Sequence, residues 1–386
     1  MIPHHLHRLL PTLVFASCLA VCNCGKTSTL TGDSAKDTVS PPTEDTPSSP
    51  SQGANWRTWG DAGQTGFVTA LGPDGTVAGV LSGQTGVEYL FLAPPGSPVE
   101  LWQAAPDNNR PVRIGHIGRN GSSCGTAYIY DPQFHGSVGA AVAGSTSSGF
   151  TRLLPDPITS TCRDGNSQGD YVGEWKAQGF LKTVDGGTIR LDLVRGPAQS
   201  SYVLTTPVAI NSRGDVAGAI QYGESIGRGN PAPFVRWSDG GVSFLLNNLR
   251  SSVATDISDT GIVIGAGLPA DSEFSTAMIW TDPLDAGIFL PLPEGLISSR
   301  ALSINSHGVV VGYGLSGSFD SHGLVWFDGG VYLADEFWAP SPGWRISRLD
   351  FVNDSNRLAG EASFSETQPD GGVVMISLPM ILDVDF

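Results

Sequence analysis

Apolar and polar residues follow one another in a nine-residue phrase that recurs seven times along the chain. In most copies an apolar residue leads into a short turn rich in Asn, Asp, Ser and Gly, and two or three strand-forming residues follow before a closing glycine. The closing glycines are Gly79, Gly125, Gly173, Gly218, Gly265, Gly312 and Gly360. This order of residue types predicts a strand, a tight turn and a second strand in each copy.

The spacing of the phrase predicts the architecture. Successive closing glycines are 46, 48, 45, 47, 47 and 48 residues apart. Most units carry a second apolar run, such as AMIW at 277–280, and in two units an Asp-Gly-Gly turn follows that run. Two hairpins per unit give four strands, which is the content of one propeller blade. We therefore expect an all-β fold, a seven-bladed β-propeller of four-stranded blades, over residues 55–386.

Such a ring has to close, and the last unit lacks a clear fourth strand. The segment NWRTW at 55–59 precedes the first unit and can supply that strand. The C-terminal segment LDVDF at 382–386 is the alternative.

The fifth position of the phrase holds glycine in six units and Asn356 in the last. Glycine and asparagine are the residues that best tolerate a left-handed backbone. The turn is therefore predicted to need a positive φ at this position.

The first 54 residues are of a different kind. Residues 1–24 combine a basic start with the short apolar run LLPTLVFA, which predicts a signal peptide. Residues 15–18 resemble the bacterial lipobox, so Cys18 is the expected lipidation site, with Cys22 and Cys24 as rivals and ordinary secretion as the alternative. Residues 25–54 contain no aromatic residue and are Ser-, Thr- and Pro-rich, which predicts a disordered tether.

The net charge limits the classes of partner that we expect. The net charge is −16 with 21 Lys and Arg against 37 Asp and Glu. A surface that neutralises phosphates is absent, so nucleic acid is not an expected partner. The acidity favours solubility in an open compartment. Together with the predicted signal peptide and lipobox, we expect an exported monomer at the outer membrane or cell surface, held to the membrane only by its lipid, or otherwise a secreted protein.

Two cysteines remain outside the N-terminal segment, Cys124 and Cys162. In an exported protein they can form a disulfide between neighbouring units. The positions equivalent to Cys124 hold small or β-branched apolar residues, so a buried thiol is the alternative.

The phrase and its continuation resemble the HAF family of extracellular bacterial repeats. The clearest units are 301–312 with 324–326 and 254–265 with 277–280, and the similarity covers roughly residues 67–376. The resemblance implies an exported β-repeat protein and brings no catalytic residues with it.

Residues that carry catalysis are not evident in the sequence. The motifs of serine hydrolases, zinc proteases and calcium loops are missing from it. The Asn and Asp side chains of the turns are explained by local backbone capping, so no metal or cofactor is expected. Adjacent acids such as Asp335 and Glu336 could serve a glycosidase, which keeps an enzyme as an alternative reading.

The remaining evidence on function comes from the connections between the predicted strands. Alternate connections of an up-and-down blade lie at one end, so the tight turns share one end and the long connections share the other. The long connections carry the aromatic residues that we single out as ligand-binding candidates: Trp338, Trp344, Tyr222, Phe319, Phe274 and Tyr202. Trp338 and Trp344 rank first because their segment is Pro-rich, whereas Trp237, Trp280 and Trp326 are expected in the core.

The sequence thus predicts a cell-surface binding or scaffold module for an envelope protein or a polysaccharide. A purely structural envelope protein is the first alternative. A polysaccharide lyase or glycosidase that uses the long connections is the second.

Overall fold

The structure is a computed structural model. It describes residues 55–384 apart from short gaps at 61–63, 84–86, 104–110, 119–120, 132–135, 156–158, 177, 193–201, 224–229, 246–248, 284, 339–342 and 368–370. The predicted signal peptide, the lipidation candidates Cys18, Cys22 and Cys24, and the predicted tether lie outside the described residues. Among the described residues, no helix is long and apolar enough to cross a membrane.

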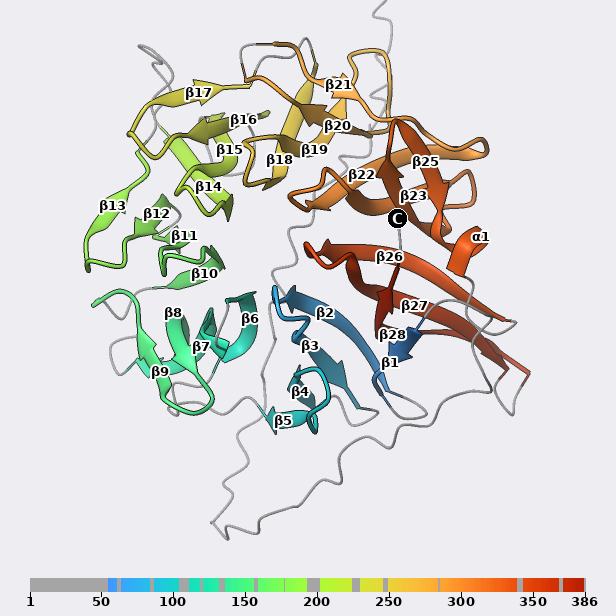
Figure 1. Cartoon of the computed structure of the whole chain (residues 1–386), viewed down its shortest axis with the longest axis horizontal. Helices are drawn as coiled ribbons and strands as arrows, with labels where there is room; N and C mark the ends of the chain where they lie inside the picture. The colour runs from blue at the N-terminus through green and yellow to red at the C-terminus, as the bar shows by residue number, and fades with distance from the viewer. Residues whose placement is uncertain are drawn as a thin grey trace, which may run out of the picture. The chain divides into compact units, whose positions relative to one another are not determined.

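Seven four-stranded antiparallel sheets form a ring of blades (Figure 1), so the predicted seven-bladed β-propeller is confirmed. Blade 1 contains β2 (Thr65–Leu71), β3 (Val77–Ser82), β4 (Glu88–Ala93) and β5 (Glu100–Gln103). Blade 2 contains β6 (Pro111–Ile117), β7 (Ser123–Asp131), β8 (Gly136–Ser145) and β9 (Gly149–Arg152). Blade 3 contains β10 (Ser160–Gly165), β11 (Tyr171–Trp175), β12 (Gln178–Lys182) and β13 (Thr188–Arg190). Blade 4 contains β14 (Tyr202–Ile210), β15 (Val216–Gly223), β16 (Pro231–Arg236) and β17 (Val242–Phe244).

The other three blades follow the same order from the inner strand outwards. Blade 5 contains β18 (Ser251–Ile257), β19 (Val263–Leu268), β20 (Thr276–Trp280) and β21 (Ile288–Phe289). Blade 6 contains β22 (Leu296–Ile304), β23 (Val310–Ser316), β24 (Ser321–Phe327) and β25 (Gly330–Leu333). Blade 7 contains β26 (Trp344–Val352), β27 (Arg357–Thr367), β28 (Val373–Asp383) and β1 (Asn55–Thr58). The short helix α1 (Ala334–Trp338) connects blades 6 and 7.

The ring closes through the N-terminal segment. Strand β1 pairs antiparallel with β28 and places Asn55 opposite Asp383 and Thr58 opposite Met380. Of the two closures that the sequence allowed, the structure contains the one in which residues from before the first unit complete the last blade. This pairing ties the start of the described chain to its end.

A β-bulge explains the closing glycine of each repeat. In all seven inner strands the register with the second strand shifts by one residue at the same place, beside the partner of that glycine. A Cβ on Gly360 would meet the carbonyl oxygen of Arg348, and one on Gly79 would meet both the carbonyl oxygen of Phe67 and the ring of Phe91. Only glycine leaves room for the bulged inner strand.

The predicted positive φ at the fifth position is confirmed in all seven turns. The six glycines at this position have φ between 71° and 90°, and Asn356 has a φ of 56°. The turn therefore closes with a left-handed residue, which is why only glycine and asparagine occur there.

Apolar residues fill the spaces between neighbouring sheets. One cluster joins Ile264 and Ala277 of blade 5 to Ala301 and Leu324 of blade 6. Trp280 and Trp326 are buried, as expected. Trp237 differs, because it lies one residue further along its blade than the other two and is only partly buried. The shift by one residue puts its indole on the other side of the sheet, where Nε1 donates to the hydroxyl of Ser243.

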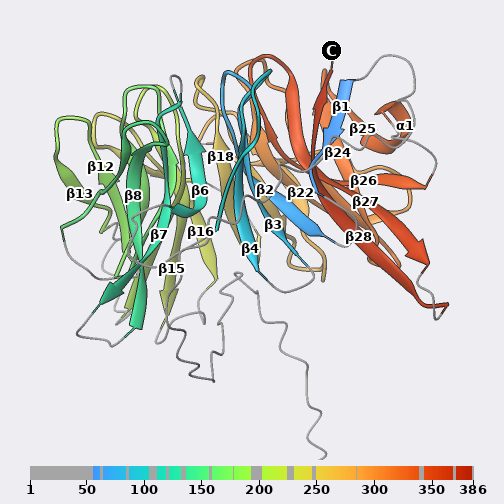
Figure 2. The ribbon, with the colours of Figure 1, turned by 90° about the horizontal axis from the view of Figure 1, so that it is seen from below.

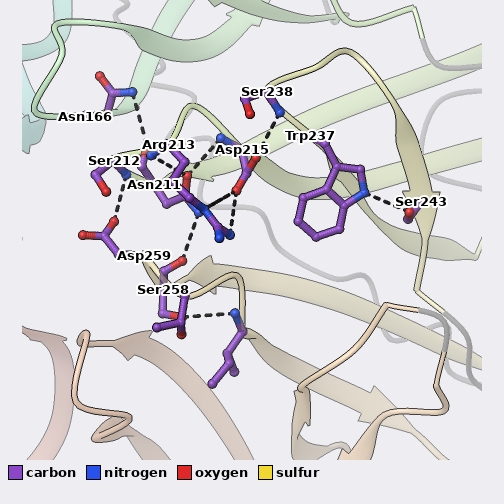
Figure 3. Close-up of polar contacts among 12 residues, drawn as sticks. Asn166, Asn211, Ser212, Arg213, Asp215, Trp237, Ser238, Ser243, Ser258 and Asp259 are labelled. Atoms are coloured by element: carbon purple, nitrogen blue, oxygen red, sulfur yellow. Dashed lines mark hydrogen bonds and ion pairs between the residues drawn. The ribbon is translucent and has the colours of Figure 1, made fainter.

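The turn asparagines do more than cap their own backbone. Oδ1 of Asn211 accepts hydrogen bonds from the amides of Arg213 and Asp215, which is the predicted local capping. Its Nδ2 donates to the carbonyl oxygen of Ser258 in the next blade, and Asn166 does the same to Asn211 (Figure 3). These side chains link successive blades at the end of the ring that carries the tight turns.

A disulfide joins blades 2 and 3. The sulfur atoms of Cys124 on β7 and Cys162 on β10 are 1.99 Å apart, with the two Cα atoms 5.9 Å apart. Both cysteines are buried in the cluster between these blades. The structure therefore has the bridged form of the two alternatives that the sequence left open.

Candidate functional site: the long connections of blades 5 to 7

The four strands of each blade run alternately up and down (Figure 2), so the described residues of the long connections lie at the end of the ring opposite the tight turns. Tyr202 begins β14 and Tyr222 lies near the end of β15, and the register pairs Val203 with Tyr222 at this end of blade 4. The side chains of Tyr202 and Tyr222 lie outside the part of the chain that the structure describes. The other four candidates belong to blades 5, 6 and 7.

Phe319 occupies the position of glycine in a turn of the repeat type. The amide of Ser316 donates to the carbonyl oxygen of Asp320, and the amide of Phe319 donates to that of Ser316. The tight turn that starts at Asn305 has the same two bonds, with Gly308 at the equivalent place. Phe319 has a φ of 65° and is 67% exposed. A bulky residue in this region of φ is rare and costs energy.

Phe319 contacts a second aromatic residue from the neighbouring blade. Its ring centroid is 6.5 Å from that of Phe274, with the planes tilted by 53°. Phe274 lies on the connection between β19 and β20 and is half-buried, and its amide donates to the hydroxyl of Ser272. Offset or tilted ring pairs of this kind are favourable, so the connections of blades 5 and 6 support one another here.

Two charged residues extend this surface to blade 7. Asp320 follows Phe319 and accepts a hydrogen bond from the hydroxyl of Ser318 at 2.6 Å. Its other carboxylate oxygen is 3.8 Å from Nη1 of Arg345, which lies on β26. We call Phe274, Phe319, Asp320 and Arg345 the loop patch. Neither Asp320 nor Arg345 was among the predicted site residues. The signal for Asp320 is the segment Ser-x-Ser-Phe-Asp at 316–320, which repeats the turn phrase with Phe in place of Gly; the sequence holds no comparable signal for Arg345.

Trp338 and Trp344 lie partly in the core of blade 7. Both are half-buried and pack against its main cluster, which includes Leu349 and Ala362. The Trp344 ring centroid is 4.5 Å from that of Phe364. Helix α1 places Trp338 against the sheet, which the Pro-rich sequence alone did not indicate. Among the four candidates with described side chains, Phe319 is therefore the most exposed.

The adjacent acids Asp335 and Glu336 have different surroundings. Oδ1 of Asp335 accepts a hydrogen bond from the amide of Ile346, and Oδ2 is 3.7 Å from Nδ1 of His322. Burial raises the pKa of Asp335. Glu336 is exposed. Asp335 thus anchors the start of β26 to helix α1, which is a structural role.

No group of three or more His, Cys, Asp or Glu side chains in the described part of the chain is arranged to hold a metal ion. The loop patch offers the exposed ring of Phe319, the carboxylate of Asp320 and the guanidinium of Arg345. Such a set can stack against a flat apolar surface and hydrogen-bond to the polar groups around it.

No family model matches the chain, and no curated protein sequence matches it. Several solved structures share its general arrangement. The β-propeller domain of the Trilobed protease from Pyrococcus furiosus is 10% identical, with 81% of this chain and 93% of that chain covered and a TM-score of 0.49. Dipeptidyl peptidase 4 from Porphyromonas gingivalis is 10% identical, with 80% and 52% covered and a TM-score of 0.46. A gluconolactonase from Xanthomonas campestris is 11% identical, with 87% and 91% covered and a TM-score of 0.40. Likeness at these levels carries no argument about activity.

Proposed function

We propose that this chain is an exported, lipid-anchored propeller that binds a polysaccharide of the cell envelope or its surroundings through the loop patch. The observation that carries the proposal is the backbone of Phe319. A phenylalanine at φ 65° replaces the glycine of the repeat turn, and this residue is 67% exposed. Burial of so small a part of the side chain does not offset the backbone strain, so we infer that the ring contacts another molecule.

A saccharide fits the chemistry of the patch. The apolar face of a sugar ring packs on an exposed aromatic ring, while Asp320 and Arg345 can hydrogen-bond to hydroxyl groups at its edge. Phe274 holds the Phe319 ring from the neighbouring blade. Residues on loops that a rigid scaffold positions are where binding commonly resides.

The export signal and anchor complete the proposal. Cys18 is the proposed lipidation site, and residues 25–54 are the proposed tether, with no nucleic acid partner and a monomeric state. A flexible tether of 30 residues would place the propeller roughly 30 Å from the membrane on average. Labelling cells with a palmitate analogue should mark the wild-type chain and not Cys18→Ser, whereas loss of label only in Cys22→Ser would move the site.

The ligand is tested by screening the full chain against a glycan array and, in parallel, by a pull-down with envelope proteins. We expect retention on a glycan, and loss of that retention in the double variant Phe274→Ala/Phe319→Ala. Phe289→Ala is the matched control, because Phe289 is a 41% exposed aromatic on the outer strand β21. A pull-down that responds to the double variant, with no glycan retained, would assign the patch to a protein partner instead.

A further inference from the structure

Three arginines occupy one level of the ring. The strand register identifies the equivalent residue on every inner strand, because each pairs with the residue that follows the closing glycine. These pairs are Phe67 with Val80, Arg113 with Thr126, Thr161 with Glu174, Thr206 with Ala219, Val253 with Ala266, Arg300 with Tyr313, and Arg348 with Glu361. The inner strands are the ones nearest the middle of the ring (Figure 1).

The level is asymmetric. Blades 6, 7 and 2 contribute Arg300, Arg348 and Arg113, and the blade between the last two contributes Phe67. Blades 3 to 5 contribute only small side chains at this position, two threonines and a valine. The chain has a net charge of −16 with only 21 basic residues, so three arginines at equivalent positions in one half of the ring are a concentration of positive charge.

Aromatic rings and one carboxylate orient two of the three guanidinium groups. The guanidinium carbon of Arg348 lies 5.1 Å from the ring centroid of Tyr313 in blade 6. That of Arg113 lies 5.9 Å from the ring centroid of Phe67 in blade 1. Nε of Arg348 also donates to Oδ1 of Asp350 at 2.5 Å. Contact with a ring face fixes the plane of a guanidinium group and with it the directions of its N–H donors.

Asp350 and Glu361 are the acidic groups beside Arg348. The charge of Arg113 also favours the ionised form of Asp350. Burial and the neighbouring charge of Asp350 raise the pKa of Glu361 to about 7, against the effect of Arg348. Glu361 is therefore only partly ionised near neutral pH.

Arg300 has no acidic counterpart among these groups. Its Nε is buried and has no hydrogen-bond partner among the described residues. Burial lowers the pKa of its guanidinium, the phenol of Tyr313 opposes this shift, and the charge of Arg348 adds to it. A buried guanidinium N–H without an acceptor is costly and favours a bound group that can accept its hydrogen bond.

We propose that Arg113, Arg300 and Arg348 form a binding site for a single carboxylate group on the inner strands of blades 2, 6 and 7. The guanidinium fork matches a carboxylate with two parallel hydrogen bonds. Asp350 and Glu361 already place negative charge beside Arg348, which suits a monoanion better than a phosphate dianion. The ligand class is an organic acid or an acidic sugar. This site is separate from the loop patch and does not depend on it.

Calorimetric titration of the full chain at fixed ionic strength tests this site. Glucuronate, its neutral analogue glucuronamide, acetate and inorganic phosphate are the probes. We expect glucuronate to bind and glucuronamide to bind at least tenfold more weakly. Acetate that binds as tightly as glucuronate would show that the site recognises the carboxylate alone, and weaker acetate binding would show that it recognises an acidic sugar; both outcomes support the site. Equal binding of glucuronamide, or tighter binding of phosphate than of glucuronate, overturns the carboxylate assignment.

Variants separate binding from a structural role. Arg300→Gln and Arg348→Gln should each weaken glucuronate at least tenfold, and Arg348→Lys should fall between wild type and Arg348→Gln because it keeps the charge and loses the fork. Arg190→Gln, an exposed arginine paired with Asp192 on the outside of blade 3, should bind as wild type. Thermal unfolding is measured on each variant without ligand. Arg300→Gln should unfold at or above the wild-type temperature, and a lower temperature with unchanged glucuronate affinity would show a structural arginine and contradict the proposal.

Discussion

Nδ2 of Asn353 donates a hydrogen bond to the carbonyl oxygen of Gly72 at 3.2 Å, across 281 residues of sequence. This contact joins the last blade to the first at the end with the tight turns, while β1 joins them through the outer strand. Oδ1 of Asn353 also accepts from the amides of Ser355 and Arg357. One side chain therefore holds its own turn and the closure of the ring.

Substitutions of Asn353 should separate these two roles. Asn353→Asp keeps an acceptor for the local amides and loses the donor to Gly72, and it should cost about 1 kcal/mol of unfolding free energy. Asn353→Ala loses both and should cost about 2–3 kcal/mol. Denaturant unfolding gives both values. Equal losses in the two variants would show that the contact with Gly72 contributes nothing.

The closing glycine should not accept a methyl group. A Cβ on Gly265 would meet the carbonyl oxygen of Val253, so we expect Gly265→Ala to cost ~2–3 kcal/mol or to shift the bulge of the inner strand. Gly317→Ala is the control, because nothing lies within 4 Å of a Cβ there. Thermal unfolding of the two variants side by side is the measurement, and a Gly265→Ala protein as stable as the control refutes the steric explanation of the repeat.

Asp256 should make stability depend on pH. Burial, and less strongly the charge of Asp164, raise its pKa to about 7, although the amides of Ile304 and Ile257 donate to it. The hydroxyl of Ser303 is the other polar group beside it. A raised pKa means that the folded protein holds this proton longer than the unfolded chain does. The stability it contributes is therefore complete below the ordinary value near 3.8 and is lost as the pH rises through 7.

Asp256→Asn removes this dependence. At pH 8 the variant should be more stable than wild type by about 2 kcal/mol, because wild type loses about 3 kcal/mol of stability between pH 5 and its raised pKa. At pH 5 it should be about 1 kcal/mol less stable, because asparagine has one carbonyl acceptor for the two amides. Unfolding curves at both values of pH test the sign, and a variant that is destabilised equally at pH 5 and pH 8 would contradict the raised pKa.

The tryptophans should divide into two classes. Trp280 and Trp326 are fully buried, and each change to Ala should cost about 3–5 kcal/mol. Trp338 and Trp344 are half-buried at the edge of the blade 7 cluster, so Trp338→Ala/Trp344→Ala should cost less per residue. If the second pair is as destabilising as the first, both indoles are packing residues and contribute no binding surface.

Periodicity was sufficient to predict the blades, because each unit repeats the same residue types at the same places. The positive φ of Gly214, which is 85° in the structure, could be predicted from residue identity alone. The bulge opposite Gly218 could not, because a one-residue shift of register leaves the apolar pattern of the phrase unchanged.

The candidate site was harder to predict. Phe319 and Phe274 were selected as aromatics on long connections, but their contact depends on how blades 5 and 6 stand side by side. The partial burial of Trp338 depends on helix α1, which a five-residue segment before prolines does not indicate. The level shared by Arg300 and Arg348 appears only when the register of the inner strands is known.

Phe319→Gly tests the central claim, that an exposed aromatic ring is held in a glycine conformation in order to bind a ligand. Glycine fits the backbone at φ 65° and relieves a strain of about 1–2 kcal/mol, in part offset by the greater freedom of glycine in the unfolded chain. Affinity for the glycan found by the array and the free energy of unfolding are measured on the same preparation. We predict at least tenfold weaker binding with stability within about 1 kcal/mol of wild type. Unchanged binding, or a loss of several kcal/mol, would contradict the account.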